Sequence, residues 1–188
     1  TPGYEHLETV ILQSHMDMVC EKNADKVHDF ENDPIRTIID GEWLHADGTT
    51  LGADNGIGCA TELAILDSDD IEHGPIECLF TMDEETGMTG AMNLKPGFFN
   101  GKILLNLDSE DEGELFIGCA GGMGTMAEFA YEKREATDDY LYFEVKVSGL
   151  KGGHSGGEIH IGLGNANKIL TRYLYALEHE LDWKLCSF

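Results

Sequence analysis

Four short motifs in this sequence carry side chains that can bind metal ions or move protons. They are the H-x-D of "SHMDM", the aspartate of "GADNGIG", the acidic pair of "DEETG" and the aspartate of "NLDSE". A two-metal hydrolytic centre needs imidazole and carboxylate ligands, one carboxylate that bridges both ions, and a free carboxylate that takes a proton from water. The residues that offer this set are His15, Asp17, Asp54, Glu84, Glu85 and Asp108.

Local sequence features suit these side chains to such a centre. Asp17, two residues beyond His15, is placed to hold the second ring nitrogen of that imidazole. Asp54 lies in a glycine-flanked turn, where backbone freedom allows a close approach to an ion. Because Glu84 and Glu85 are adjacent, one can bind metal while its neighbour stays free as a base.

The elements that must position these residues have the pattern of an α/β sheet. Short apolar runs of strand length cover residues 9–14, 76–82 and 102–107. Residues 57–66 have helical spacing, and strands that alternate with helices predict a sheet covered on its faces. Ligands of open α/β sheets bind outside the carboxyl ends of the strands. Since the polar motifs follow the apolar runs, we expect their side chains to converge at one edge of the sheet.

The last third of the chain has a different pattern. The glycine-rich "GCAGGMG" at 118–124 suits a domain junction, so we predict one domain over 1–120 and a second over 121–188. Residues 124–131 and 140–147 alternate as strands do, and residues 165–181 carry one apolar helical face, with Asn165 as the N-cap. This second part is predicted to be an α+β unit.

Composition narrows the class of protein. Lys and Arg total 12 against 36 Asp and Glu, a formal net charge of -24, which repels nucleic-acid backbones and anionic membrane surfaces. No run approaches the ~18 apolar residues that span a bilayer. The five cysteines are scattered and form no C-x-x-C pair, which indicates a reducing compartment. We therefore expect a cytoplasmic protein that binds neither nucleic acid nor membrane.

The joint order of the motifs is more specific than any one of them. H-x-D, then G-x-D-N-G, then D-E-E-T-G, then a strand ending L-D-S-E resembles the co-catalytic zinc metallopeptidase family that includes carnosinases, aminoacylases and succinyl-diaminopimelate desuccinylases. "FIGCAGG" and "GGHSGGEIHIGLGNANK" extend the likeness over most of the chain. The resemblance implies part of a zinc-peptidase catalytic sheet with flanking helices, followed by the first part of an α+β lid domain. It also implies hydrolysis of dipeptides, notably Xaa-His, by a water activated on two metal ions.

The resemblance assigns a role to each residue of the motifs. His15 and Asp108 would bind one metal, Glu85 the other, and Asp54 would bridge both with a cis peptide bond after it. Asp17 would orient His15, and Glu84 would be the general base. His154, in "GGHSGG", would be the lid histidine that stabilises the oxyanion. Zinc is the implied metal, two ions per complete site, and Mn or Co stays open.

The family's remaining histidine ligand follows the lid in a much longer chain. We therefore expect this sequence to be a piece of such an enzyme, incomplete at both ends of its catalytic domain and inactive by itself. A dipeptide is the expected substrate, and a homodimer of the full-length protein stays open. Two alternatives remain: a related deacylase or desuccinylase, or a non-catalytic acidic metal-binding module, which would leave the adjacent Glu84 and Glu85 unexplained.

Overall fold

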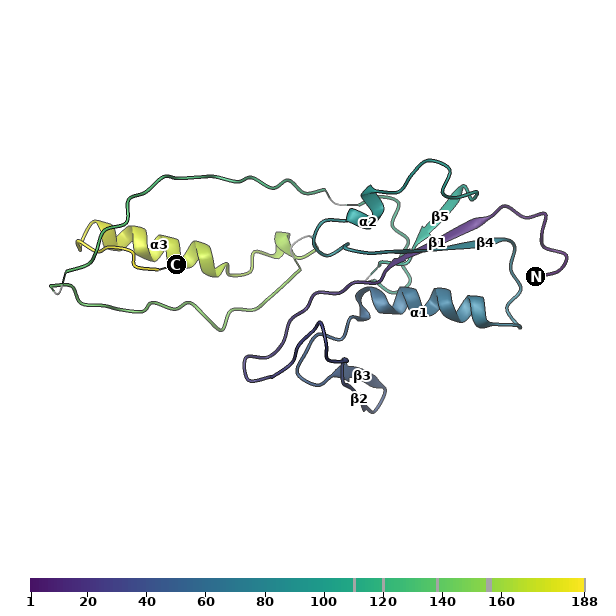
Figure 1. Ribbon diagram of the computed structural model, residues 1–188, viewed down its shortest axis with the longest axis horizontal. Coiled ribbons are helices and arrows are strands. Elements are labelled where there is room, and N and C mark those ends of the chain that lie inside the picture. Colours follow the sequence, from purple (N-terminus) through teal and green to yellow (C-terminus); the bar gives the residue numbers. More distant parts are fainter. Residues whose placement is uncertain (110, 120, 138, 155–156, 188) are drawn as a thin grey trace. The chain divides into compact units, whose positions relative to one another are not determined.

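The chain divides into two compact units in a computed structural model, Thr1–Glu114 and Leu115–Phe188 (Figure 1). The structure describes residues 1–109, 111–119, 121–137, 139–154 and 157–187. No helix within these described ranges is both long and apolar enough to cross a membrane. The predicted domain boundary at residue 120 stays a prediction.

A parallel sheet forms the centre of the first unit. Its strands are β1 (Val10–His15), β4 (Ile76–Thr81) and β5 (Ile103–Asn106), in the order β4-β1-β5. All three match the apolar runs that predict strands. The buried apolar side chains of the described residues are Ile11, Leu12 and Leu79, which lie on the central strand and its neighbour β4. The apolar core is therefore small and lies within these two strands.

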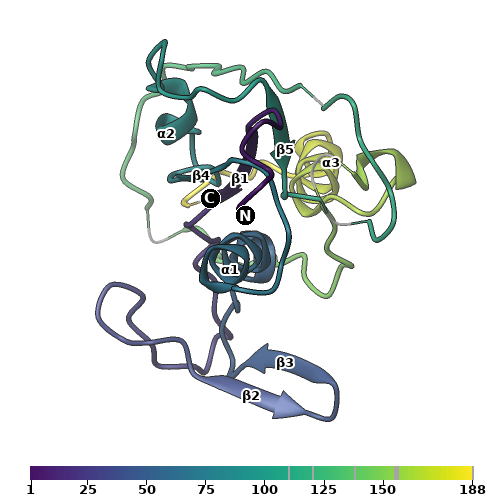
Figure 2. The ribbon, with the colours of Figure 1, turned by 90° about the vertical axis from the view of Figure 1, so that its right-hand side faces the viewer.

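Helix α1 (Ala53–Asp67) packs against β1 and covers one face of the sheet (Figure 2). It confirms the helix predicted at 57–66. The helix buries polar side chains, since Glu62 is completely inaccessible and accepts a hydrogen bond of 2.7 Å from the Ser14 hydroxyl. A short helix, α2 (Thr89–Met92), follows the loop after β4. The contact of α1 with β1 places the start of the helix beside the end of the strand.

An antiparallel hairpin precedes α1 and was not among the predicted elements. It pairs β2 (Thr37–Asp40) with β3 (Trp43–Ala46), with Asp40 opposite Trp43. Gly41 in its turn has a φ of 62°, which a glycine adopts without steric cost. The two strands are almost wholly solvent-exposed, so the hairpin contributes little to the core.

The second unit contains helix α3 (Ala166–Glu178) and a 3-10 turn at Ile159–Ile161. Asn165 caps α3 as predicted, because its side chain accepts a 2.9 Å hydrogen bond from the Lys168 amide. The strands predicted at 124–131 and 140–147 are wrong: both segments are described, and neither is a strand.

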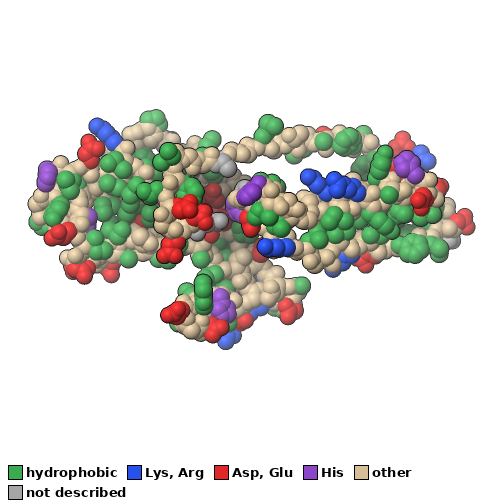
Figure 3. Space-filling view, turned by 180° about the vertical axis from the view of Figure 1, so that it is seen from behind, with side chains coloured by type: hydrophobic (Ala, Val, Ile, Leu, Met, Phe, Trp, Pro, Cys, Tyr) green, Lys and Arg blue, Asp and Glu red, His purple; other side chains and the backbone are tan. Residues whose placement is uncertain are grey.

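These two predictions fail because a strand forms only when its backbone makes hydrogen bonds with a partner strand. Alternation of apolar and polar residues marks a sequence suited to a sheet face, but it does not supply the partner. Side chains expected to face a core instead lie in solvent, as Phe129, Leu141 and Phe143 are each more than 80% exposed. Figure 3 shows such hydrophobic side chains at the molecular surface.

Candidate metal centre

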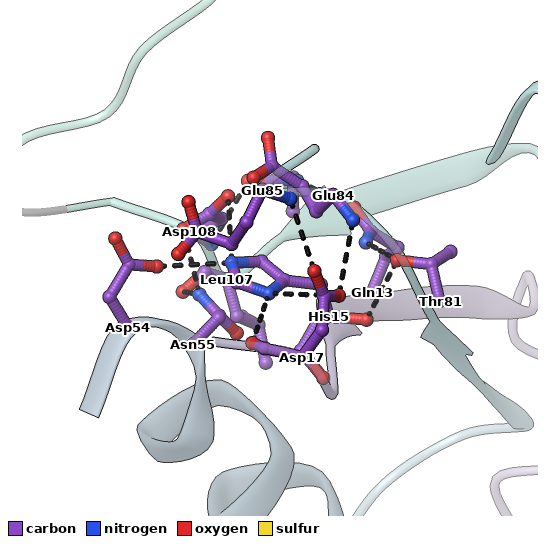
Figure 4. Close-up of polar contacts among 12 residues, drawn as sticks. Gln13, His15, Asp17, Asp54, Asn55, Thr81, Glu84, Glu85, Leu107 and Asp108 are labelled. Atoms are coloured by element: carbon purple, nitrogen blue, oxygen red, sulfur yellow. Dashed lines mark hydrogen bonds and ion pairs between the residues drawn. The ribbon is translucent and has the colours of Figure 1, made fainter. Parts of the chain in front are cut away.

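The sheet topology brings the polar motifs of the first unit to one edge. His15 is the last residue of β1, the acidic pair Glu84 and Glu85 follows β4, and Asp108 follows β5. Because the three strands are parallel, their carboxyl ends lie side by side. Asp54 reaches the same edge from the first turn of α1 (Figure 4). The predicted convergence is therefore present in the fold.

The imidazole of His15 is the buried centre of the cluster, with 1% of its side chain exposed. Its Nδ1 lies 2.9 Å from the backbone carbonyl of Asp17, and its Nε2 lies 3.1 Å from Asp54 Oδ1 and 3.8 Å from Asp108 Oδ2. Burial lowers the pKa of His15, but the hydrogen bond and charge of Asp54, the charge of Asp108 and the Asp17 carbonyl together outweigh burial and raise it. The carboxylates thus favour positive charge at Nε2, supplied by a proton or by a metal ion.

Asp17 joins two strand ends rather than facing an ion. Its carboxylate accepts hydrogen bonds of 3.1 Å from the backbone amides of both Glu84 and Glu85. Burial raises the pKa of Asp17, but these two amides, the Asp17 amide and the charge of His15 together outweigh burial and lower it. The carboxylate lies 3.5 Å from His15 Nδ1, farther than the Asp17 carbonyl oxygen. The carbonyl therefore supplies the shorter contact to the ring, while the carboxylate fixes the loop after β4.

The turn that delivers Asp54 depends on unusual backbone. Gly52 has a φ of 79°, and a Cβ there would lie 2.7 Å from Met18 Sδ, so both conformation and space favour glycine. The peptide bond between Asp54 and Asn55 is cis, as the resemblance implied. The side chain of Asp54 is 57% exposed, so its carboxylate stays accessible from solvent while one oxygen faces His15.

The two adjacent glutamates differ in their surroundings. Glu84, with Asp108, lines a small cavity of about 110 Å³, which is large enough for ordered water. Burial raises the pKa of Glu84; the His15 charge opposes this rise, and the charges of Asp108, Glu85 and Asp54 add to it. Among the described residues, none donates a hydrogen bond to the Glu84 carboxylate. A carboxylate of raised proton affinity beside a water-sized cavity can act as a general base.

Three side chains of the cluster have ligand atoms close enough to one another to hold a metal ion. One ligand atom each from His15, Asp54 and Glu85 lie within 4.8 Å of one another. Ligands of one tetrahedral zinc lie ~3.4 Å apart, given zinc–ligand distances of ~2.0–2.2 Å. Imidazole and carboxylate oxygens are donors that zinc accepts, and a divalent ion would offset the gathered negative charge. The residues present therefore fit a metal ion.

Asn55 also contributes its side chain to this edge of the sheet, although the "GADNGIG" motif predicted a metal ligand only at Asp54. Its Nδ2 lies 3.0 Å from Asp108 Oδ1 and 3.0 Å from the Leu107 carbonyl oxygen. Burial raises the pKa of Asp108, and the hydrogen bond from Asn55 opposes that rise. The sequence signal for this role was the polar side chain immediately after a predicted ligand at a helix start.

His154 lies in the second unit. Its Nδ1 accepts a 2.9 Å hydrogen bond from the Gly157 amide, and its own amide donates to the Glu158 carboxylate at 2.8 Å. These contacts join His154 to Gly157 and Glu158. The role predicted for His154 at the centre in the first unit stays a prediction.

A parallel sheet with acid and imidazole side chains at its strand ends can hold a metal ion, and sequence comparison shows which family has this arrangement. Residues 11–164 match peptidase family M20/M25/M40, and this chain belongs to that family. The matched range contains every residue of the candidate centre and His154. Metal dependence is general in this family, which agrees with the cluster described above.

Individual relatives are dipeptidases and other peptidases. The chain is 52% identical over 188 residues to the cytosol non-specific dipeptidase of Escherichia coli K12, a match that covers all of this chain and 39% of that protein. It is 43% identical over 105 residues to peptidase T of Bacillus velezensis, covering 53% of this chain and 25% of that one.

A solved structure agrees with these sequence matches. The crystal structure of aminoacylhistidine dipeptidase from Vibrio alginolyticus superposes with a TM-score of 0.64 at 50% identity. The match covers 97% of this chain and 37% of the chain in that crystal structure. The chain thus spans less than two fifths of the length of these two dipeptidases.

Proposed function

We propose that the full-length protein hydrolyses the peptide bond of dipeptides, notably Xaa-His, in the cytoplasm, on a centre of two zinc ions. Family membership and the names of the two dipeptidase relatives support this reaction. The same comparisons do not favour a deacylase, a desuccinylase or a non-catalytic module. Zinc suits the mixed imidazole and carboxylate donors, and Mn or Co could occupy the same ligands.

One observation carries the proposal: the ends of β1 and β4 and the start of α1 bring one ligand atom each of His15, Asp54 and Glu85 within 4.8 Å of one another. We assign His15 and Asp108 to one metal, Glu85 to the other, and Asp54 to both. Asp54 suits the bridging role because one oxygen faces His15 while its side chain stays open to solvent. The Asp17 carbonyl oxygen lies 2.9 Å from His15 Nδ1, which would leave Nε2 to bind the metal.

Bound zinc would supply a Lewis acid that polarises the peptide carbonyl and makes water acidic near neutral pH. Glu84 would take the proton from that water on a carboxylate oxygen and return it to the leaving amine. Its neighbour Glu85 is held in register by Asp17, which binds the amides of both glutamates. The base and the ligand therefore share one loop that Asp17 joins to the end of β1.

We also assign residues 1–120 to the catalytic domain and 121–188 to the first part of the lid. In this assignment His154 would come from the lid and donate to the oxyanion that forms as water attacks the carbonyl. A donor of this kind contributes ~3 kcal/mol to transition-state stabilisation.

The test measures zinc content and hydrolysis of an Xaa-His dipeptide by variants of the full-length protein. Glu84→Gln keeps size and polarity but removes the basic oxygen, so zinc should remain while turnover falls by roughly 10²–10⁴-fold. Glu85→Gln should lower zinc content together with activity. Glu72→Gln is the matched control, because Glu72 is an exposed residue preceding β4, beyond the opposite end of that strand.

Loss of zinc from the Glu84 variant with retention by the Glu85 variant would mean that the two roles are reversed. If both variants kept zinc and full activity, the proposed reaction at this centre would be wrong. The Glu72 variant should match the unaltered protein in both measurements.

A further inference from the structure

The side chain of Asn55 is almost completely buried beside the candidate centre. Asn55 is 2% exposed. Its side-chain amide nitrogen donates hydrogen bonds to the Leu107 carbonyl oxygen and to Asp108 Oδ1, each at 3.0 Å (Figure 4). These contacts join the start of α1 to the loop that follows β5. A single amide group thus holds both the backbone and the carboxylate at the end of that strand.

The orientation of this amide follows from its partners. A backbone carbonyl and an ionised carboxylate only accept hydrogen bonds, so the NH₂ group of Asn55 must face them. Its Oδ1 is buried and has no hydrogen-bond partner among the described residues. A Cβ at Gly58 would lie 2.1 Å from that oxygen and 2.9 Å from Ser14 Cβ. The close packing at Gly58 therefore leaves the amide little room to turn.

Fixing one oxygen of Asp108 also determines where the other points. With Oδ1 bound to Asn55, Oδ2 lies 3.8 Å from His15 Nε2, on the side where the metal is proposed. Within the described part of the chain, β5 pairs with β1 alone, so Asp108 follows an edge strand. Without Asn55, the Asp108 carboxylate would keep, among the described residues, only its contacts with Asp54 and His15, so it could rotate more freely about its side-chain bonds.

We propose that Asn55 is a positioning residue that acts through Asp108: its amide holds one carboxylate oxygen so that the other is directed at the metal bound by His15. This inference rests on the proposed metal centre and adds to it a residue outside the ligand set. Residues that orient metal ligands are worth about 10–100-fold in metal affinity. Asn55 should have an effect of this size on the ion shared by His15 and Asp108.

The experiment compares zinc binding by the unaltered full-length protein and by Asn55→Ala, using competition with a chelator. One of the two zinc ions should bind about 10–100-fold more weakly in the variant, while the other keeps its affinity. Asn100→Ala is the matched control, since Asn100 donates its amide to Glu77 at 2.8 Å before β5, away from the centre. That control should bind both ions as the unaltered protein does.

Two failures can be told apart. A full-length protein that binds no zinc would overturn the proposed function, and this inference with it. Two zinc ions bound with unchanged affinity by Asn55→Ala would overturn the role of Asn55 alone. Equal weakening of both ions would also overturn it, because a general loss of structure does not act through one ligand.

A measurement on the unaltered protein decides the matter if the variant does not fold. The side-chain NH₂ resonances of Asn55 should shift in ¹⁵N nuclear magnetic resonance spectra when zinc is added, because the carboxylate that accepts from them binds the ion. Those of Asn100 should stay in place. Asn55 resonances that do not respond to zinc would contradict the proposed connection.

Discussion

Asp17 offers the sharpest test of how the centre is held together. Its carboxylate, with 26% of the side chain exposed, accepts two backbone hydrogen bonds of 3.1 Å from Glu84 and Glu85. In Asp17→Asn one oxygen can still accept one amide, but the new NH₂ group would face the other amide, donor against donor. A hydrogen bond to a charged group contributes ~1.5–3 kcal/mol, so we expect a loss of about 2 kcal/mol of unfolding free energy.

The assay is urea unfolding at pH 7, followed by circular dichroism. Asp29→Asn is the matched control, because Asp29 also accepts a backbone hydrogen bond, 3.0 Å from the Glu31 amide, but is exposed. Water can replace its contacts, so the control should lose less than about 0.5 kcal/mol. Equal stability of Asp17→Asn and the unaltered protein would refute the reasoning, as would an equal loss in both variants.

The pH dependence follows from the pKa of Asp17. This pKa is below its ordinary value of 3.8 in the folded chain, because the backbone hydrogen bonds, chiefly from Glu85 and Glu84, and the charge of His15 together outweigh the effect of burial. The folded carboxylate therefore binds a proton more weakly than the unfolded one, and its stabilisation is fully present above pH 3.8. It is lost as the pH falls through the folded pKa. The stability difference between Asp17→Asn and the unaltered protein should shrink accordingly in acid.

Two further predictions concern α1 and α3. Burial raises the pKa of Glu62 above 4.5, and hydrogen bonds from Ser14 and Cys78 lower it by less. Ionised Glu62 therefore destabilises the fold as the pH rises from 4.5. The stability of Glu62→Gln relative to the unaltered protein should grow between about pH 4.5 and 8. A constant difference between their urea midpoints would contradict this prediction. Asn165→Ala removes the cap on the Lys168 amide and should cost α3 ~1 kcal/mol; unchanged helical circular dichroism on heating would count against the cap.

Local signals in the sequence were sufficient for the parallel strands and for the long helix of the first unit. Three apolar runs of strand length predicted β1, β4 and β5, and helical spacing predicted α1. Asn165 was predictable as a cap since its side chain satisfies an amide only three residues away. The exposed hairpin at Thr37–Ala46 lacked such a signal, because it contributes little to the core.

The order of the motifs also predicted which side chains converge. A parallel sheet places all carboxyl strand ends at one edge, so His15, Glu85 and Asp108 could be expected together before the strand order was known. The prediction failed in the second unit, where alternation at 124–131 and 140–147 did not produce strands. Alternation is local, whereas the partner strand that a ladder requires is a property of the whole fold.

Only the tertiary structure decided how the converging groups are connected. The strand order β4-β1-β5 puts β1 in the middle, and this order lets the Asp17 carboxylate reach the amides of Glu84 and Glu85. The packing of α1 on β1 likewise brings Asn55 to Asp108, a residue 53 positions later in the chain. Residue types and spacing specify what each side chain can bind, but hydrogen bonds between distant segments depend on backbone positions that only packing fixes.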